Sequence, residues 1–210
     1  NITVIHNGVN QSFIDEMLAK PINNDKKEIV IGFTGFIHPW HGMDKAIDAI
    51  AKYKALPLKL ICVGDGNILP ELKAQAKALG ISDKIEFAGL VTRDKVLDYV
   101  EQFDIALQPD VTAYASPLKM FEYMAVGSVI IAPEYPNIRE ILSDETALFF
   151  EKGNQTSFID KLEYAIEHIN ELDVLRTAVK SSVVDKQFIW QENAKRIVKL
   201  FETENSTQKR

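Results

Sequence analysis

The residues of Tyr114–Gly127 have the types and the spacing of a loop and helix that bind a phosphate group. Ser116 can act as the N-cap and Pro117 as the first helical residue, where the missing N–H costs nothing. The free N–H groups of such a first turn, together with the positive end of the helix dipole, attract an anion. Lys119 lies in the same turn and opposes the dipole by about 0.3–1 kcal/mol. A negative ligand between the two would remove that conflict.

Glu122 follows about one helical turn further along. Its carboxylate can accept hydrogen bonds from two neighbouring hydroxyl groups, such as those of a ribose. Gly127 ends the helix, and residues 128–133 are an apolar run typical of a buried strand. Phosphate donors followed by a ribose-binding carboxylate predict a nucleotide as the ligand. The alternative is an ordinary capped helix whose lysine and glutamate face solvent.

Apolar runs of strand length alternate with amphipathic segments of helical period along the chain. The expected strands are Ile29–Phe33, Leu58–Val63, Lys84–Phe87, Ile105–Leu107, Val129–Ile131 and Ala147–Phe150. The expected helices are Asp44–Tyr53, Ile68–Leu79, Asp94–Gln102, the helix of Lys119 and Glu122, Asn137–Leu142, Thr156–Ile169, Asp173–Val183 and Gln191–Thr203. This alternation predicts an α/β fold with a doubly wound parallel sheet, covered on both faces, and additional C-terminal helices. Ligands of such sheets bind at the carboxyl ends of the strands.

Three further segments lie outside this alternation. Ile2–Ile5 is strand-like, residues 23–27 are polar and predict a linker, and residues 204–210 predict a frayed polar tail. The chain begins without methionine and runs at once into a strand-like segment, so we expect a fragment of a longer protein.

The loop after the first strand of the sheet combines two glycines with two histidines. Gly35 and Gly42 would let a ligand approach the backbone closely. His38 and His41 can donate to a phosphate, although a structural turn with surface histidines is the alternative, which we favour for His38. Asp44 can cap the following helix. A metal site is not predicted, because no further ligands stand at a suitable spacing.

The next loop contains Gly64 and Gly66 and resembles the start of a dinucleotide fingerprint. Leu69 occupies the position of the third glycine, so the G-x-G-x-x-G pattern fails. A tight turn close to a ligand remains the prediction for this loop.

The loop after the third strand offers backbone groups to a nucleobase edge. The candidates for this contact, together with Gly64, are Leu90, Val91 and Thr92. Arg93, the next residue along the chain, is expected to be a surface residue.

Composition limits the classes of function. The chain has 210 residues, enough for one large domain or a domain with an extension. Its net charge is −6 and it has no basic stripe, which argues against nucleic acid as a partner. Cys62 is the single cysteine, so an internal disulfide is excluded and a buried thiol is expected. No signal peptide or membrane-spanning run is visible, and a cytoplasmic location fits.

Eight short segments share their order and spacing with one enzyme family. They are Ile5–Asn10, Gly35 to Gly42, Val63–Gly66, Phe87–Gly89, Asp104–Leu107, Ser116–Gly127, Ile130–Glu140 and Phe188–Trp190. Together they resemble the C-terminal half of a group 1 glycosyltransferase, that is, family 4 of the retaining enzymes with the GT-B fold. The resemblance covers nearly the whole chain.

The resemblance implies a Rossmann-like domain that binds the sugar nucleotide and faces an acceptor-binding domain across a cleft. Residues 1–22 would lead in from that absent N-terminal domain, residues 23–187 would form the nucleotide-sugar-binding domain, and residues 188–210 would form a helix and tail that pack toward the absent domain. The implied donor is a UDP- or GDP-type sugar, no metal cofactor is needed, and the glycosyl group is transferred with retention. No catalytic residue is assigned, and the isolated domain is expected to be inactive.

The same resemblance assigns roles on the helix described first. Glu122 matches the second glutamate of the family's Glu-x7-Glu motif and would bind the ribose. The backbone of Pro117, Leu118 and Lys119 would meet the phosphates.

Three positions depart from the family pattern. Tyr114 stands where the first glutamate of the motif is expected. Phe36 and His41 replace an arginine and a lysine that hold the diphosphate. We hypothesise that Lys119, helped by His41, takes over the lost charge.

The acceptor, a glycan or a lipid-linked acceptor, would be held by the absent domain, and peripheral association with the inner face of the cytoplasmic membrane would occur through that domain. Two other functions were weighed besides transfer. One is a degenerate, non-catalytic nucleotide-binding module, favoured by the missing motif glutamate and the missing basic pair. The other is a sugar-nucleotide epimerase on the same fold. A dinucleotide-dependent dehydrogenase is disfavoured by the failed glycine pattern.

Overall fold

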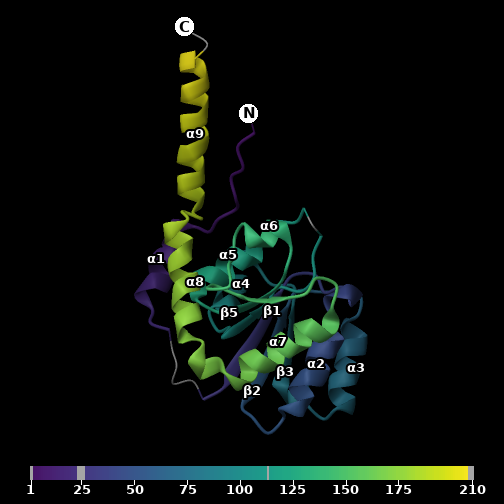
Figure 1. Cartoon of the computed structure of the whole chain (residues 1–210). Helices are drawn as coiled ribbons and strands as arrows, with labels where there is room; N and C mark the ends of the chain where they lie inside the picture. Colours follow the sequence, from purple (N-terminus) through teal and green to yellow (C-terminus); the bar gives the residue numbers. More distant parts are fainter. Residues whose placement is uncertain (1, 23–26, 113, 208–210) are drawn as a thin grey trace.

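The computed structural model of the chain describes residues 2–22, 27–112 and 114–207. Its centre is a six-stranded, wholly parallel sheet in the order β3-β2-β1-β4-β5-β6 (Figure 1). The strands are β1 Ile29–Thr34, β2 Leu58–Val63, β3 Ile85–Gly89, β4 Ile105–Leu107, β5 Val129–Pro133 and β6 Leu148–Phe150. The predicted doubly wound α/β fold is confirmed, and the predicted strands lie where the apolar runs placed them.

Helices cover both faces of the sheet. The α-helices are α1 Gln11–Ala19, α2 Met43–Lys52, α3 Leu69–Ala78, α4 Arg93–Val100, α5 Leu118–Val126, α6 Pro136–Arg139, α7 Gln155–Glu167, α8 Asp173–Asp185 and α9 Trp190–Thr207. Short 3₁₀ turns lie at Pro39–His41, Ser82–Lys84 and Ile169–Glu171. One core packs α2, α3 and α7 against the sheet, and a second packs α1, α4, α5, α6 and α8 against the opposite face.

The strands are apolar because both of their faces are covered. In β1, Ile31 and Phe33 enter the first core, whereas Val30 enters the second. Cys62 on β2 is buried in the first core, and burial raises the pKa of its thiol to about 12. The predicted role of a buried core thiol is therefore confirmed.

The N-terminal segment departs from prediction in two ways. Helix α1 was not expected, yet Phe13, Ile14 and Met17 bury one of its faces in the second core. Ile2–Ile5 was expected to be a strand but forms neither helix nor strand, and Ile2 is 96% exposed. No other described strand lies beside this segment, so its backbone has no ladder to join.

The two ends of the chain are joined at the edge of the domain. Val9 N–H donates to the carbonyl of Phe188 at 3.0 Å, and Trp190 N–H donates to the carbonyl of Val9 at 3.0 Å. Phe188 is buried, and its ring meets the ring of Phe121 edge-on at a centroid distance of 5.1 Å.

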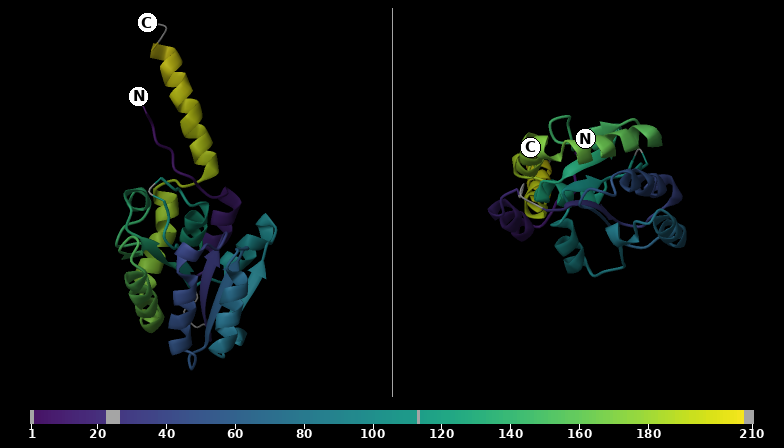
Figure 2. Two further views of the ribbon diagram at one scale, coloured as in Figure 1. Left: turned by 90° about the vertical axis from the view of Figure 1, so that its right-hand side faces the viewer. Right: turned by 90° about the horizontal axis from the view of Figure 1, so that it is seen from below.

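Helix α9 stands away from the body of the domain, and the N-terminal stretch runs beside it (Figures 1 and 2). The apolar side chains Ile197, Val198, Leu200 and Phe201 of this helix are exposed. The helix continues to Thr207, into the segment expected to be a frayed tail. Residues 23–26 of the predicted linker and 208–210 of the predicted tail lie outside the described residues.

The order of the strands creates one topological switch point. From β1 the chain moves outward to β2 and β3, and it then returns to place β4 on the other side of β1. The loops after β1 and β4 therefore diverge and leave a crevice at the carboxyl edge of the sheet, where ligands of open α/β sheets bind.

Gly64 lets the loops after β1 and β2 meet at this edge. Its φ is +132°, and a Cβ at this position would lie 2.1 Å from the carbonyl oxygen of Gly35. We expect Gly64→Ala to lower the free energy of unfolding by about 3 kcal/mol or more, through overpacking and backbone strain together. Urea denaturation would measure the loss. Gly80 is a matched control, because its φ is +68° and a Cβ there would meet no atom within 4 Å. Gly80→Ala should cost only about 1–2 kcal/mol, and equal losses in the two variants would contradict the role given to the contact.

Candidate functional site

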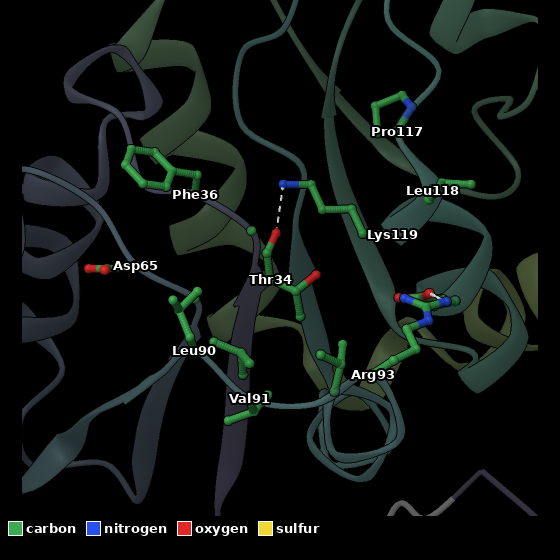
Figure 3. A pocket seen from close by; sticks show the side chains of 14 residues that line it. Thr34, Phe36, Asp65, Leu90, Val91, Arg93, Pro117, Leu118 and Lys119 are labelled. Atoms are coloured by element: carbon green, nitrogen blue, oxygen red, sulfur yellow. Dashed lines mark hydrogen bonds and ion pairs between the residues drawn. The ribbon is translucent and has the colours of Figure 1, made fainter.

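A cavity of about 460 Å³ occupies the crevice at the switch point. This volume lies within the range of small-molecule sites. Its wall combines the loops that follow β1, β2 and β3 with the first turn and a half of α5 (Figure 3). The lining residues are Thr34, Gly35, Phe36, Val63, Gly64, Asp65, Leu90, Val91, Arg93, Val96, Pro117, Leu118, Lys119 and Glu122.

Lys119 reaches across the cavity from α5 to the end of β1. Its Nζ donates to the carbonyl oxygen of Thr34 at 3.0 Å (Figure 3). The same atom lies 4.1 Å from the centre of the Phe33 ring. Burial lowers the pKa of this amine to about 7, although the charge of Glu122 opposes the shift. Lys119 is therefore not the solvent-facing lysine of the alternative interpretation. Its amine is held inside the site, and a pKa of about 7 means that the amine is only partly protonated at neutral pH.

Glu122 is the buried carboxylate of the cavity. Its side chain is only 3% exposed and forms an ion pair between Oε1 and Nη2 of Arg93. Burial raises the pKa of the carboxyl, while Arg93 and then Lys119 lower it. Sequence reasoning placed Arg93 on the surface, and 67% of its side chain is indeed exposed, but its end turns inward to Glu122. No local pattern joins these two residues, which lie 29 positions apart.

Ser116 does not cap α5, so this prediction is wrong. The helix begins at Leu118, and Pro117 is its N-cap with an extended backbone. Ser116 precedes a proline, which disfavours helical backbone, and both its carbonyl and its Oγ accept hydrogen bonds from Nδ2 of Asn7 at 3.0 Å. Ser116 thus ties the loop to the N-terminal segment and does not line the cavity. Pro117, Leu118 and Lys119 do line it.

The loop after β1 that carries His38 and His41 contributes residues to two cavities. Gly35 lines the main one, with a φ of +126°, and a Cβ there would approach Nζ of Lys119. His41 instead lines a smaller cavity of about 160 Å³ beside Trp40 and Asp110. Its Nδ1 accepts from the N–H of His38 at 3.2 Å, and burial, followed by the charges of Lys119 and His38, lowers its pKa to about 4. His41 is therefore neutral at neutral pH and can donate only through Nε2.

Gly42 lines neither cavity; it adopts φ +65° and ends the 3₁₀ turn of Pro39–His41. It also precedes α2 as the N-cap residue, so Asp44 lies inside the first turn of that helix and not at its cap.

Three of the four base-contact candidates lie at the cavity. Gly64, Leu90 and Val91 line it, and Leu90 is 81% exposed. Thr92 does not line the cavity, because it is the extended N-cap residue at which the chain turns into α4. The N–H of Gly64 donates to the carbonyl of Gly89 at 2.9 Å, which closes the gap between the two loops.

Tyr114 is 88% exposed and does not line the cavity. The described side chains bring no group of three or more His, Cys, Asp or Glu together that could hold a metal ion. In the same part of the chain, no helix has both the length and the apolar character of a membrane span.

Residues 28–168 match the family described as Glycosyl transferases group 1. The chain belongs to this family. The family predicted from the sequence segments is therefore confirmed, and the matched range contains every residue that lines the main cavity.

Two curated relatives of this group 1 glycosyltransferase chain carry a lipid in their names. The phosphatidylinositol N-acetylglucosaminyltransferase GPI3 subunit of Saccharomyces cerevisiae is 24% identical over 184 residues, which are 87% of this chain and 40% of that protein. The alpha-monoglucosyldiacylglycerol synthase of Streptococcus pneumoniae is 28% identical over 116 residues, which are 54% of this chain and 26% of that protein. The chain thus spans less than half the length of either relative.

A solved structure supports the fold of this group 1 glycosyltransferase chain. The HepE protein of Anabaena, determined in complex with UDP and glucose, superposes with a TM-score of 0.72 at 18% identity. The superposition covers 95% of this chain and 56% of HepE.

Proposed function

We propose that this chain is the donor-binding half of a retaining glycosyltransferase and binds a nucleoside diphosphate sugar in the main cavity. One observation carries the proposal: Lys119 and Glu122, one turn apart on α5, both line the same cavity at the switch point. A cation and a buried carboxylate at that spacing suit the diphosphate and the ribose of one ligand.

The other walls suit the remaining parts of such a ligand. The first N–H groups of a helix attract an anion, so the start of α5 suits a phosphate next to Lys119. The β3–α4 loop offers the apolar side chains of Leu90 and Val91 and its backbone groups to the base. The relatives add support, since the solved structure of HepE contains UDP.

In the proposed reaction the bond between the anomeric carbon and the diphosphate breaks, and a bond from that carbon to an acceptor hydroxyl oxygen forms. The leaving diphosphate gathers negative charge and can take up the hydroxyl proton. The start of α5 and the ammonium of Lys119 stabilise that charge.

The second candidate function is a nucleotide-binding module without transferase activity. It is favoured by Tyr114 and Phe36, which occupy positions where a motif glutamate and an arginine are expected.

The acceptor belongs, in this proposal, to a second domain that residues 1–22 connect to residues 23–187, with residues 188–210 packing back toward it. The exposed apolar side chains of α9 support such packing. Both curated relatives carry a lipid in their names, and this favours a lipid-linked acceptor at the cytoplasmic face of a membrane. The isolated chain would then bind the donor but transfer nothing.

A thermal-shift panel tests the proposed function. UDP, GDP, ADP and their sugar conjugates would each be added to the chain, and we expect one diphosphate to raise the melting temperature. A ligand at 100 times its dissociation constant adds about 2.7 kcal/mol to the stability of the native state. If none of the nucleotides shifts the transition, nucleotide binding by this chain is contradicted. Binding by a protein that includes the acceptor half but transfers no sugar would favour the non-catalytic module.

A further inference from the structure

Arg93 and Glu122 form an ion pair whose two side chains differ strongly in solvent exposure. Arg93 comes from the first turn of α4, at the rim of the cavity, and most of its side chain is exposed. Glu122 comes from α5 and is buried in the wall. The guanidinium of the mostly exposed Arg93 side chain thus forms an ion pair with a carboxylate that is almost fully shielded from solvent.

A buried carboxylate needs a partner to remain ionised, because the low dielectric of its surroundings favours the neutral form. Around Glu122, α4 contributes Arg93 and α5 contributes Lys119 and Tyr123, while Asp65 lines the cavity on the β2 side. Tyr123 stays neutral, since burial raises its pKa, and Asp65 is no cation. Lys119 lies close to its own titration point at neutral pH. Among the described residues that line the cavity, Arg93 is therefore the cation whose charge is permanent.

The charge on Glu122 decides what the carboxyl group can bind. An ionised carboxylate is an acceptor only, with about four lone-pair positions on its two oxygens, so it can keep Arg93 and still accept from two hydroxyls. A protonated carboxyl carries an O–H donor and loses part of that capacity. Two adjacent ribose hydroxyls that both donate are therefore bound more strongly by the ionised form.

We propose that Arg93 is a positioning residue that holds Glu122 as an ionised acceptor and so makes the site select ribonucleoside over 2′-deoxyribonucleoside diphosphates. This inference rests on the proposed nucleotide site. It adds a residue of a different helix, α4, that would act on the ligand through Glu122.

The test compares Arg93→Gln and Arg93→Lys with the wild-type chain. Dissociation constants for UDP and for 2′-deoxy-UDP would be measured by calorimetry at a series of pH values from mildly acidic to mildly alkaline, because burial raises the pKa of the Glu122 carboxyl. We expect the wild-type preference for UDP to change little with pH. In Arg93→Gln the preference should fall by roughly tenfold as the pH is lowered, because Glu122 becomes protonated. Arg93→Lys should restore it.

Two results would overturn the inference. If Arg93→Gln binds UDP more tightly than the wild-type chain at every pH, Arg93 competes with the ribose for the Glu122 carboxylate. If the preference stays the same in all three proteins, the ion pair is a surface contact of little consequence.

An infrared measurement on the free protein separates this inference from the proposed function. A carbonyl band of a protonated carboxyl should appear in Arg93→Gln as the pH is lowered and be absent from the double variant Arg93→Gln/Glu122→Gln. This band needs no nucleotide, so its absence contradicts the role of Arg93 even if UDP binds. Its presence without any UDP binding by the wild-type chain would contradict the proposed function alone. Because the Arg93 side chain is mostly exposed, both variants should fold, and melting curves would verify this.

Discussion

Replacing Glu122 with glutamine is expected to weaken UDP binding by roughly 10- to 100-fold, the equivalent of one charge-assisted hydrogen bond. Glutamine keeps the shape of the side chain but offers one carbonyl oxygen in place of two carboxylate oxygens. One ribose hydroxyl then loses its acceptor, and Arg93 loses its ionic partner. Calorimetric titration with UDP would measure the change.

Deoxynucleotides supply the control for Glu122→Gln. In the wild-type chain, 2′-deoxy-UDP should bind more weakly than UDP, and Glu122→Gln should remove most of that difference. Glu122→Gln in the protein and removal of the 2′-hydroxyl in the ligand form a double-mutant cycle. The interaction energy from this cycle measures the hydrogen bond between Glu122 and the 2′-hydroxyl. If the variant weakens both ligands by the same factor, Glu122 shapes the pocket but does not bind the ribose.

Replacing Lys119 with methionine is expected to weaken UDP binding by about 10- to 100-fold at pH 6.5 and to leave uridine binding nearly unchanged, because the lost contact is an ammonium–phosphate interaction. Methionine fills a similar volume without the charge. A loss of equal size for uridine would show that the lysine supports the pocket and not the diphosphate.

The wild-type affinity for UDP should also depend on pH. The free Lys119 amine has its pKa lowered to about 7, and a bound diphosphate would raise that pKa again. Binding then takes up a proton between the two values, so affinity falls as the pH rises above 7, by up to about tenfold per pH unit. Lys119→Met should show no such slope in this range. A slope that persists in the variant would assign the proton to another group.

Lys119 has a matching effect on folding, which needs no ligand. Between pH 7 and the ordinary lysine value of 10.5, the unfolded chain keeps the proton that the folded protein has lost. The unfolded state therefore binds more protons, and this group makes the free energy of unfolding rise with pH across that window. In Lys119→Met this contribution should be absent from denaturant titrations at each pH.

Much of the fold followed from local patterns. The alternation of apolar runs with amphipathic segments placed the strands and most of the helices, because each period is set by the geometry of a few consecutive residues. Helix α1 was missed, although Phe13, Ile14 and Met17 have helical spacing. Its single buried face is short, and the segment around it was interpreted as a connection between domains.

The chemistry of α5 was also available from the sequence. Lys119 and Glu122 are three residues apart, so a helix must place them on neighbouring positions of one face. The same local reasoning failed for Ser116, because its hydroxyl is engaged by Asn7, 109 positions away.

The tertiary structure alone decided which loops share the cavity. Arg93 meets Glu122 because the strand order brings the loop after β3 and the start of α5 to the same edge of the sheet. His41 turns into a second cavity because the 3₁₀ turn of Pro39–His41 directs it there. The lowered pKa of Lys119 results from burial of its amine beside Phe33, and the spacing of residues along the sequence does not predict this burial. The sequence by itself thus determined the elements and the residues of one helix, since those depend on neighbours along the chain. Packing between distant segments determined the partners, the burial and the charge of those residues.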